Sequence, residues 1–399
     1  MYNKKTNKIN LLVTIVLLII MFQVVKNPSQ SIKSAREGLN LWFNLLLPSL
    51  FPFIFITDLL VSFGFVDFIS RYLESFMRPI FNVPGIGIFP FSMSIMSGYP
   101  VGARLTAKLR ELNLISKTVG NRLISFSSTS GPLFILGTVL IGMVGAPKLS
   151  GLMIIPHYMG ALSLGLIFRF YKRKNSTENE AVKETKVRSD LFIVEIKNKS
   201  IGSLIAKSVK DSMESIIIVG GFVIIYSVII DILLLSPIFI SFIDVIAHVT
   251  SINSEIIMGT IAGIIEITKG CEIISKLDIE IISKVILLNF IIGWGGFSIH
   301  SQALSFISST DISSKIYLLS KASHGLLSAI YTYIIYKIAY KDLIIQTYLE
   351  PIPVNEINSL SYWLELFKSS TFVVISIIVF LILLSILTNE VNSTKRKSA

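Results

Sequence analysis

Two groups of polar side chains interrupt long apolar segments of this 399-residue chain. In the first group, Pro132 follows a run of hydroxyls and cannot donate a backbone hydrogen bond, so we expect the helix to break there. Hydrocarbon offers no partner to freed peptide groups, so unwound backbone at membrane depth must lie inside protein or beside a water-filled cavity. The candidate substrate-binding residues of this group are Ser127, Ser128, Thr129, Ser130 and Gly131.

The second group occupies residues 293–302, where three glycines precede four polar side chains. A pair of interrupted spans, one in each half of a chain, is the best sequence indication of a transporter's substrate site. The candidates here are Gly295, Gly296, Ser298, His300 and Gln302. The alternatives are that hydroxyls bond helix carbonyls, that glycines allow close helix packing, and that His300 is a satisfied interior histidine.

Two apolar stretches, at 86–98 and 256–267, are too short or too broken to cross a bilayer and fit re-entrant hairpins better. Their tips supply four further candidates for substrate binding: Ser97, Gly98, Glu266 and Thr268. Ionisable groups at membrane depth are costly, which makes Glu266 a functional candidate, although it could also stand at the watery end of the hairpin.

Other ionisable residues have structural interpretations. We expect Arg104 to anchor a basic amphipathic stretch at the membrane surface and Arg122 to extend towards the interface. His157 and His324 are expected to pack or to form hydrogen bonds near the starts of spans, and Cys271, the single cysteine, is expected to be a buried filler.

No cysteine and histidine spacing suggests a metal site, and the chain contains no nucleophile elbow, phosphate-binding loop or HExxH motif. We therefore expect neither an enzyme nor an ATP-driven pump, and no cofactor. Transport would be passive or coupled to an ion that the sequence does not identify.

The elements that would position these residues are membrane helices. The chain is 52% hydrophobic and 15% charged, with a mean hydropathy of +0.72, so its apolar surface exceeds what one soluble core needs. Eight segments are long and apolar enough to span: residues 9–25, 39–60, 119–144, 149–170, 213–235, 281–307, 322–340 and 370–387. The predicted fold is an all-α polytopic membrane protein with about eight transmembrane helices and two re-entrant hairpins.

The net charge of +11 arises from basic residues at the ends of apolar runs, which indicates topology and not nucleic-acid binding. With a cytoplasmic N-terminus, 24 Lys and Arg residues, Lys321 among them, fall inside and 9 fall outside. This asymmetry predicts a multi-pass protein of the cell membrane with both termini in the cytoplasm.

The chain also divides into two similar halves. The spacing from Gly98 to Gly131 recurs from Gly263 to Gly296, at a constant offset of 165 residues. Each half would hold three crossings and one hairpin, and an odd number of crossings inserts the second half upside down, giving an inverted internal repeat. The expected domains are an N-terminal transmembrane anchor (1–34), a first gate-like repeat (35–170), a cytoplasmic basic linker (171–210), a second gate-like repeat (211–341), and a C-terminal transmembrane helix with a basic tail (342–399).

Five motifs together resemble the YlbJ family of sporulation integral membrane proteins, over roughly residues 38–340. They are LPSLFPF at 47–53, SGYPVGA at 97–103, SGPLF at 130–134, GIIEIT at 263–268 and GGFSIHSQ at 295–302. The resemblance implies a nucleoside-recognition gate domain and an architecture similar to that of concentrative nucleoside transporters.

The resemblance also implies a role in spore maturation, in which the protein would move dipicolinic acid from the mother cell across the outer forespore membrane. Residues 127–129 depart from the amide-bearing residues expected of the family at that point, so hydroxyls would replace amides. A planar dianion suits the positive ends of broken helices.

Two other functions are kept open. The chain could carry a nucleoside or another small metabolite, or it could be a non-transporting scaffold that recruits cortex-building enzymes through residues 171–210. The expected partners are the lipid bilayer and a small-molecule anion such as dipicolinate, without nucleic acid. Glycine-rich helix faces fit a homo-oligomer and intramolecular packing equally well.

Overall fold

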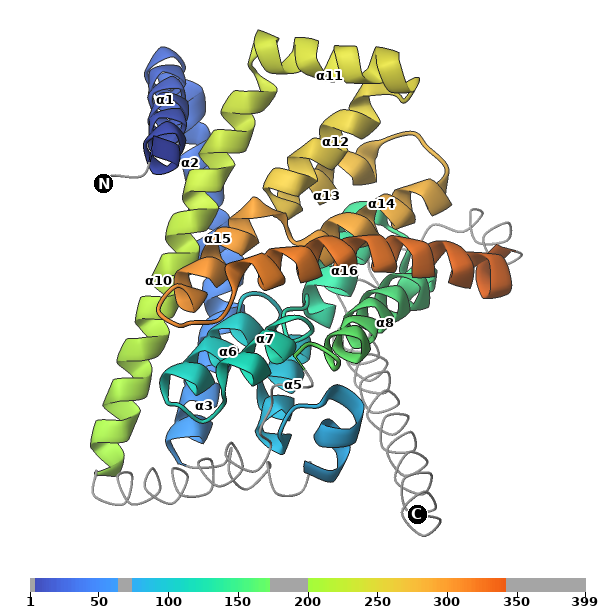
Figure 1. Cartoon of the computed structure of the whole chain (residues 1–399). Helices are drawn as coiled ribbons and strands as arrows, with labels where there is room; N and C mark the ends of the chain where they lie inside the picture. Colours follow the sequence, from blue (N-terminus) through green and yellow to red (C-terminus); the bar gives the residue numbers. More distant parts are fainter. Residues whose placement is uncertain (1–3, 64–73, 173–199, 342–399) are drawn as a thin grey trace.

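A computed structural model of the chain describes residues 4–63, 74–172 and 200–341 (Figure 1). All regular structure within these ranges is helical, as the sequence predicts. The expected span at 370–387 and most of the linker at 171–210 lie outside the described residues.

The first half of the chain contains two long helical regions followed by short helices around a break. The order is α1 (Lys4–Lys26), α2 (Pro28–Leu41), η1 (Trp42–Leu46), α3 (Leu47–Ser62), η2 (Gly85–Gly87), α5 (Ile88–Ser97), α6 (Val101–Glu111), α7 (Lys117–Ile124), η3 (Leu133–Val144), η4 (Pro147–Leu149) and α8 (Ser150–Phe168).

The second half begins with the longest described helix. The order is α10 (Ile201–Leu234), α11 (Pro237–Thr250), α12 (Ser254–Ile265), α13 (Ile267–Lys276), α14 (Ile281–Trp294), α15 (Gly296–Ile307), α16 (Ser314–Ile335) and η6 (Tyr336–Tyr340).

Helices α2, α3 and α10 pack along one another and form what we call the arm (Figure 1). Small residues permit the close approach: a Cβ added to Gly220 would lie 2.6 Å from the Trp42 ring, and one added to Gly38 would lie 2.8 Å from the Ser227 hydroxyl. The Trp42 indole also donates a hydrogen bond to the Ile216 carbonyl at 2.9 Å. The arm therefore joins the start of the chain to its middle.

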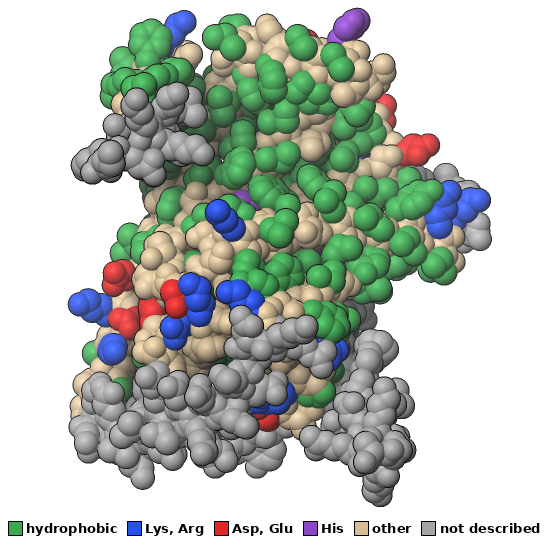
Figure 2. Space-filling view, in the orientation of Figure 1, with side chains coloured by type: hydrophobic (Ala, Val, Ile, Leu, Met, Phe, Trp, Pro, Cys, Tyr) green, Lys and Arg blue, Asp and Glu red, His purple; other side chains and the backbone are tan. Residues whose placement is uncertain are grey.

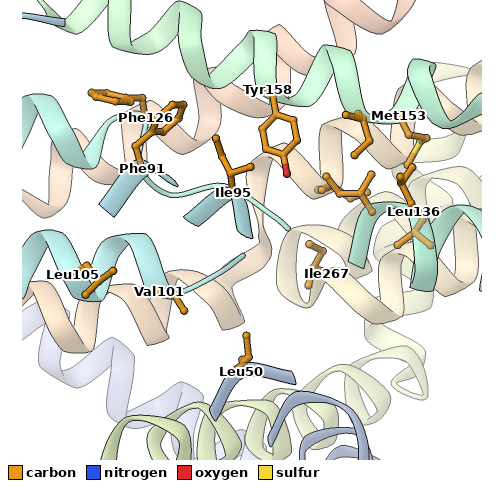
Figure 3. Close-up of a cluster of buried hydrophobic side chains, with 14 of the residues drawn as sticks. Leu50, Phe91, Ile95, Val101, Leu105, Phe126, Leu136, Met153, Tyr158 and Ile267 are labelled. Carbon is orange, nitrogen blue, oxygen red and sulfur yellow. The ribbon is translucent and has the colours of Figure 1, made fainter. Parts of the chain in front are cut away.

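The remaining helices, from α5 to α8 and from α12 to α16, form the body. Its core combines side chains from both halves, and Figure 3 shows part of it, including Phe91 on α5, Tyr158 on α8 and Ile267 on α13. The rings of Phe81 and Phe126 stack with centroids 4.7 Å apart. Lipid tails are as apolar as these side chains, so van der Waals packing must hold the body together more than a hydrophobic driving force does.

The outer surface is strongly apolar, and Figure 2 shows hydrophobic side chains over much of the upper face with many charged ones gathered in a lower band. Within the described residues, three helical segments are long and apolar enough to span a membrane: Pro147–Phe168, Ile201–Leu234 and Ile281–Ile307. Two bent helix pairs, with angles of 85° and 119°, raise the total to five if each pair is one span. These findings support a membrane protein, and the full set of eight crossings stays a prediction.

The helix breaks are placed where the sequence predicts them, but they differ in length. Residues 125–131 leave the helix after α7 and the chain resumes at η3. The second break is narrower than the stretch 293–302, because Gly295, with φ of +92°, alone separates α14 from α15. The polar residues after it therefore lie on the first turns of α15.

The two predicted hairpins correspond to the packed pairs α5 with α6 and α12 with α13. In Figure 1 the first pair lies below α15 and α16, and the second lies above them. The inverted repeat and the re-entrant placement of these pairs stay predictions.

Candidate functional site

A cavity of about 120 Å³ lies where the arm, both helix pairs and both breaks meet. Eight of the candidates selected from the sequence line it: Ser97, Gly98, Ser130, Gly131, Glu266, Thr268, Ser298 and Gln302. Apolar side chains from the arm and from η3, including Leu50, Val223 and Phe134, line it as well. The structure therefore brings candidates that are up to 205 positions apart in the sequence into one mainly apolar pocket.

Glycines allow close backbone contact between the hairpin turn and the break in each half. A Cβ added to Gly98, whose φ is +82°, would lie 2.7 Å from the Gly131 nitrogen. A Cβ added to Gly296, whose φ is +77°, would lie 3.2 Å from the Gly263 carbonyl oxygen. Each hairpin turn thus lies backbone to backbone against the break of its own half, and only glycine allows both the contact and the conformation.

Three helices begin at this pocket. Leu133 on η3, Thr268 on α13 and Ser298 on α15 each lie in a first turn and line the cavity. The first N–H groups of a helix have no partner within it, and the helix dipole places partial positive charge there. This arrangement favours an anion or an electron-rich group in the pocket.

Two buried polar atoms of the pocket have no hydrogen-bond partner among the described residues: the Ser97 hydroxyl and the Gln302 side-chain oxygen. The Gln302 amide nitrogen is engaged, since it donates to the Ser298 hydroxyl at 3.4 Å. A buried polar group without a partner costs free energy, so these two atoms are suited to a polar ligand.

Glu266 is the one carboxylate among the described residues that line the pocket, and it is 7% exposed. One carboxylate oxygen caps α13 by accepting from the Lys269 backbone nitrogen at 2.7 Å. The side chain of Lys269 instead pairs with Asp231 on the arm, at 3.3 Å. Glu266 therefore faces the pocket without a basic side chain paired to it.

Residues 127–129 lie outside the cavity lining, and the hydroxyls of Ser127 and Thr129 hold the first break against the neighbouring helices. The Thr129 and Ser94 hydroxyls are 3.0 Å apart, as are those of Ser127 and Thr106. Ser128 contributes its backbone carbonyl to a buried lysine, described below. These contacts position Ser130 and Gly131 at the pocket.

Gly295, Gly296 and His300 also lie outside the lining. Gly295 forms the turn between α14 and α15. His300 is buried, packs edge-on against Trp294 with centroids 4.2 Å apart, and has its Nδ1 atom 3.2 Å from the Tyr317 hydroxyl. The Nε2 atom of His300 is buried and has no hydrogen-bond partner among the described residues.

The interface positions expected for two arginines are wrong. Arg104 is buried and forms a two-point ion pair with Asp58 on α3, with its Nη2 atom 2.6 Å from a carboxylate oxygen. Arg122 is buried as well and donates to the backbone carbonyls of Tyr171 and Asn82. Both residues join segments of the protein and do not extend towards lipid headgroups.

Sequence reasoning missed a polar cluster directly behind the pocket. Lys321, counted among the cytoplasmic basic residues, is 1% exposed and bonds Tyr99, a lining residue. His157 and His324 join the same cluster with ring centroids 4.6 Å apart, in helices α8 and α16 and not near span starts. The available signal was the i, i+3 spacing of Lys321 and His324, which puts both on one helix face.

Comparisons with known proteins agree with this picture. A family model for the Gate domain, described as nucleoside recognition, matches residues 43–174. The chain is 33% identical over 345 residues to the sporulation integral membrane protein YlbJ of Bacillus subtilis, covering 84% of this chain and 85% of that protein. It is 32% identical over 109 residues to an uncharacterized protein of Alkalihalophilus pseudofirmus, covering 27% and 22% of the two chains. No solved structure matches.

Proposed function

Because the chain belongs to the YlbJ family of sporulation integral membrane proteins, we propose that it is a transporter that moves a small organic dianion, dipicolinic acid, during spore maturation. Transport would run from the mother cell across the outer forespore membrane. The Gate domain match and the apolar helices support a sporulation membrane protein with transporter-like features.

The observation that carries the proposal is the meeting of both broken segments at one pocket. Glu266 already caps α13, so the N-termini of η3 and α15 supply partial positive charge for carboxylates. The Ser97 hydroxyl is free to donate a hydrogen bond. The Gln302 oxygen would accept from a protonated group or an ordered water. The apolar wall formed by Leu50, Phe134 and Val223 suits one face of a planar ring.

Uptake of labelled dipicolinate by proteoliposomes that contain the purified chain tests the proposal. We expect faster uptake than by empty liposomes under at least one imposed proton or sodium gradient. Equal uptake under all gradients would overturn it. The variants Glu266→Ala and His300→Ala compare a residue that lines the pocket with one that does not. We expect Glu266→Ala to change uptake more than His300→Ala.

A nucleoside carrier is the second candidate, favoured by the family model's description as nucleoside recognition. Hydroxyl, amide and carboxylate groups such as Ser97, Gln302 and Glu266 also suit the hydroxyls of a ribose. Competition distinguishes the two: excess nucleoside should leave dipicolinate uptake unchanged if the dianion is the substrate.

A further inference from the structure

Lys321 stands behind the pocket wall, and no carboxylate of the described residues pairs with it. Its ammonium nitrogen lies 4.4 Å from the centre of the Tyr99 ring, which belongs to the cavity lining. It bonds three groups: the Tyr99 hydroxyl, the Ser128 carbonyl at 3.0 Å and the His324 Nδ1 atom at 3.3 Å. A buried cation without a carboxylate is costly, and within a membrane protein it generally has a function.

The hydrogen bonds of this cluster show how many protons Lys321 and His324 need between them. The Tyr99 hydroxyl donates to the Ile292 carbonyl at 3.1 Å, so it must accept from Lys321. The Ser128 carbonyl can only accept. His324 donates from Nε2 to the His157 carbonyl at 2.8 Å, so in its neutral form its Nδ1 atom must also accept.

The cluster contains four hydrogen bonds, and each needs its own proton. Three join Lys321 to its partners, and the fourth joins His324 to His157. A neutral amine supplies two protons and a neutral imidazole supplies one, which leaves one bond without a proton. For all four bonds to form, the Lys321–His324 pair holds one extra proton, whichever of the two groups carries it.

We propose that this pair holds a fixed positive charge behind the pocket and that the charge makes the pocket select anionic ligands over neutral ligands of the same shape. The inference rests on the proposed function and deepens it. Lys321 does not line the cavity, so it acts through Tyr99 and the Ser128 backbone as a positioning residue. The positive charge of the pair also offsets a negative charge on Glu266, which would otherwise make the pocket repel a dianion.

The test compares the affinity of the purified protein for dipicolinate with that for its neutral diamide, pyridine-2,6-dicarboxamide. For Lys321→Gln we expect the preference for the dianion to fall by about tenfold, since one charge at low effective dielectric is lost. Lys321→Arg keeps the charge and should keep the preference. Lys315→Gln, at an exposed position of the same helix, is the matched control and should equal the wild type.

If Lys321 had only a structural role, its substitution would weaken the binding of both ligands equally and leave the ratio of their affinities unchanged. That result would overturn the inference. If Lys321→Gln does not fold, the second charge-removing variant Lys321→Met and the charge-keeping variant Lys321→Arg decide the question. Loss of the preference in a folded Lys321→Arg protein that still binds the diamide would also overturn the inference. Failure of the wild type to bind dipicolinate at all would instead overturn the proposed function.

Discussion

At the scale of single residues, the pocket is defined by polar atoms that lack partners. The Ser97 hydroxyl and the Gln302 side-chain oxygen are buried without a hydrogen bond among the described residues, although each could be satisfied by a ligand. The sequence identified both as candidates, Ser97 at the tip of a predicted hairpin and Gln302 within a predicted helix break. It did not identify Lys321, because the burial of a charged residue depends on acceptors from distant segments, here Tyr99 and Ser128, as well as on His324 of the same helix.

Removing either unpartnered atom should weaken ligand binding and leave folding intact. We expect Ser97→Ala and Gln302→Leu each to lower dipicolinate affinity by roughly tenfold, the effect of about one lost hydrogen bond. Ser92→Ala is the control, because its hydroxyl bonds the Phe89 carbonyl of its own helix, away from the pocket. Titration calorimetry measures the affinities, and unchanged affinity in both pocket variants would contradict their assignment.

At the scale of elements, the breaks are the features that sequence predicts best. Pro132 and the clustered glycines locate both breaks, since they interrupt helices for local reasons. The length of the second break was not predictable, because a single glycine with positive φ at position 295 turns the chain within one residue. Which hydroxyls face the pocket was not predictable either, since the first break packs against α5 and α6, which turns Thr129 and Ser127 towards these helices.

The contact of α6 with the first break supplies a prediction about stability. A Cβ added to Gly102 would lie 1.6 Å from the Ser127 carbonyl oxygen, so Gly102→Ala must push α6 away from the break. We expect a loss of about 3 kcal/mol or more, the upper range for overpacking. Gly221→Ala on α10, where a Cβ meets nothing within 4 Å, is the control and should be neutral or slightly stabilising. Thermal unfolding in detergent measures both, and equal melting temperatures would contradict the packing described.

At the scale of the whole molecule, two acidic residues of the arm form ion pairs with the body. Asp58 on α3 binds Arg104 and Lys108 on α6, and Asp231 on α10 binds Lys269 on α13. Arg104 and Lys269 are 165 positions apart, the offset that relates the two halves. The sequence revealed that offset but not the pairs, because an acidic residue of the arm has no local pattern that marks its partner.

The Asp58–Arg104 and Asp231–Lys269 ion pairs should differ in strength. The side chains of Asp58 and Arg104 are 1% and 8% exposed, whereas those of Asp231 and Lys269 are 11% and 29% exposed. Asp58→Asn leaves a buried guanidinium without its carboxylate and should cost about 3–5 kcal/mol. Asp231→Asn should cost less, because Lys269 is partly exposed and keeps a second carboxylate, Glu272, at 3.7 Å. The same unfolding assay ranks them, and a larger loss for Asp231→Asn would contradict this account.

Protection of single cysteines by substrate tests the central claim most directly, namely that the pocket between the two breaks is the transport site. Cys271 is the one native cysteine and is buried, so Cys271→Ala gives a background for Ser97→Cys and Ser298→Cys. We expect both introduced thiols to react with a small water-soluble thiosulfonate and to be protected by dipicolinate, while Ser92→Cys gains no protection. Protein that takes up dipicolinate while neither pocket thiol is protected would contradict the account.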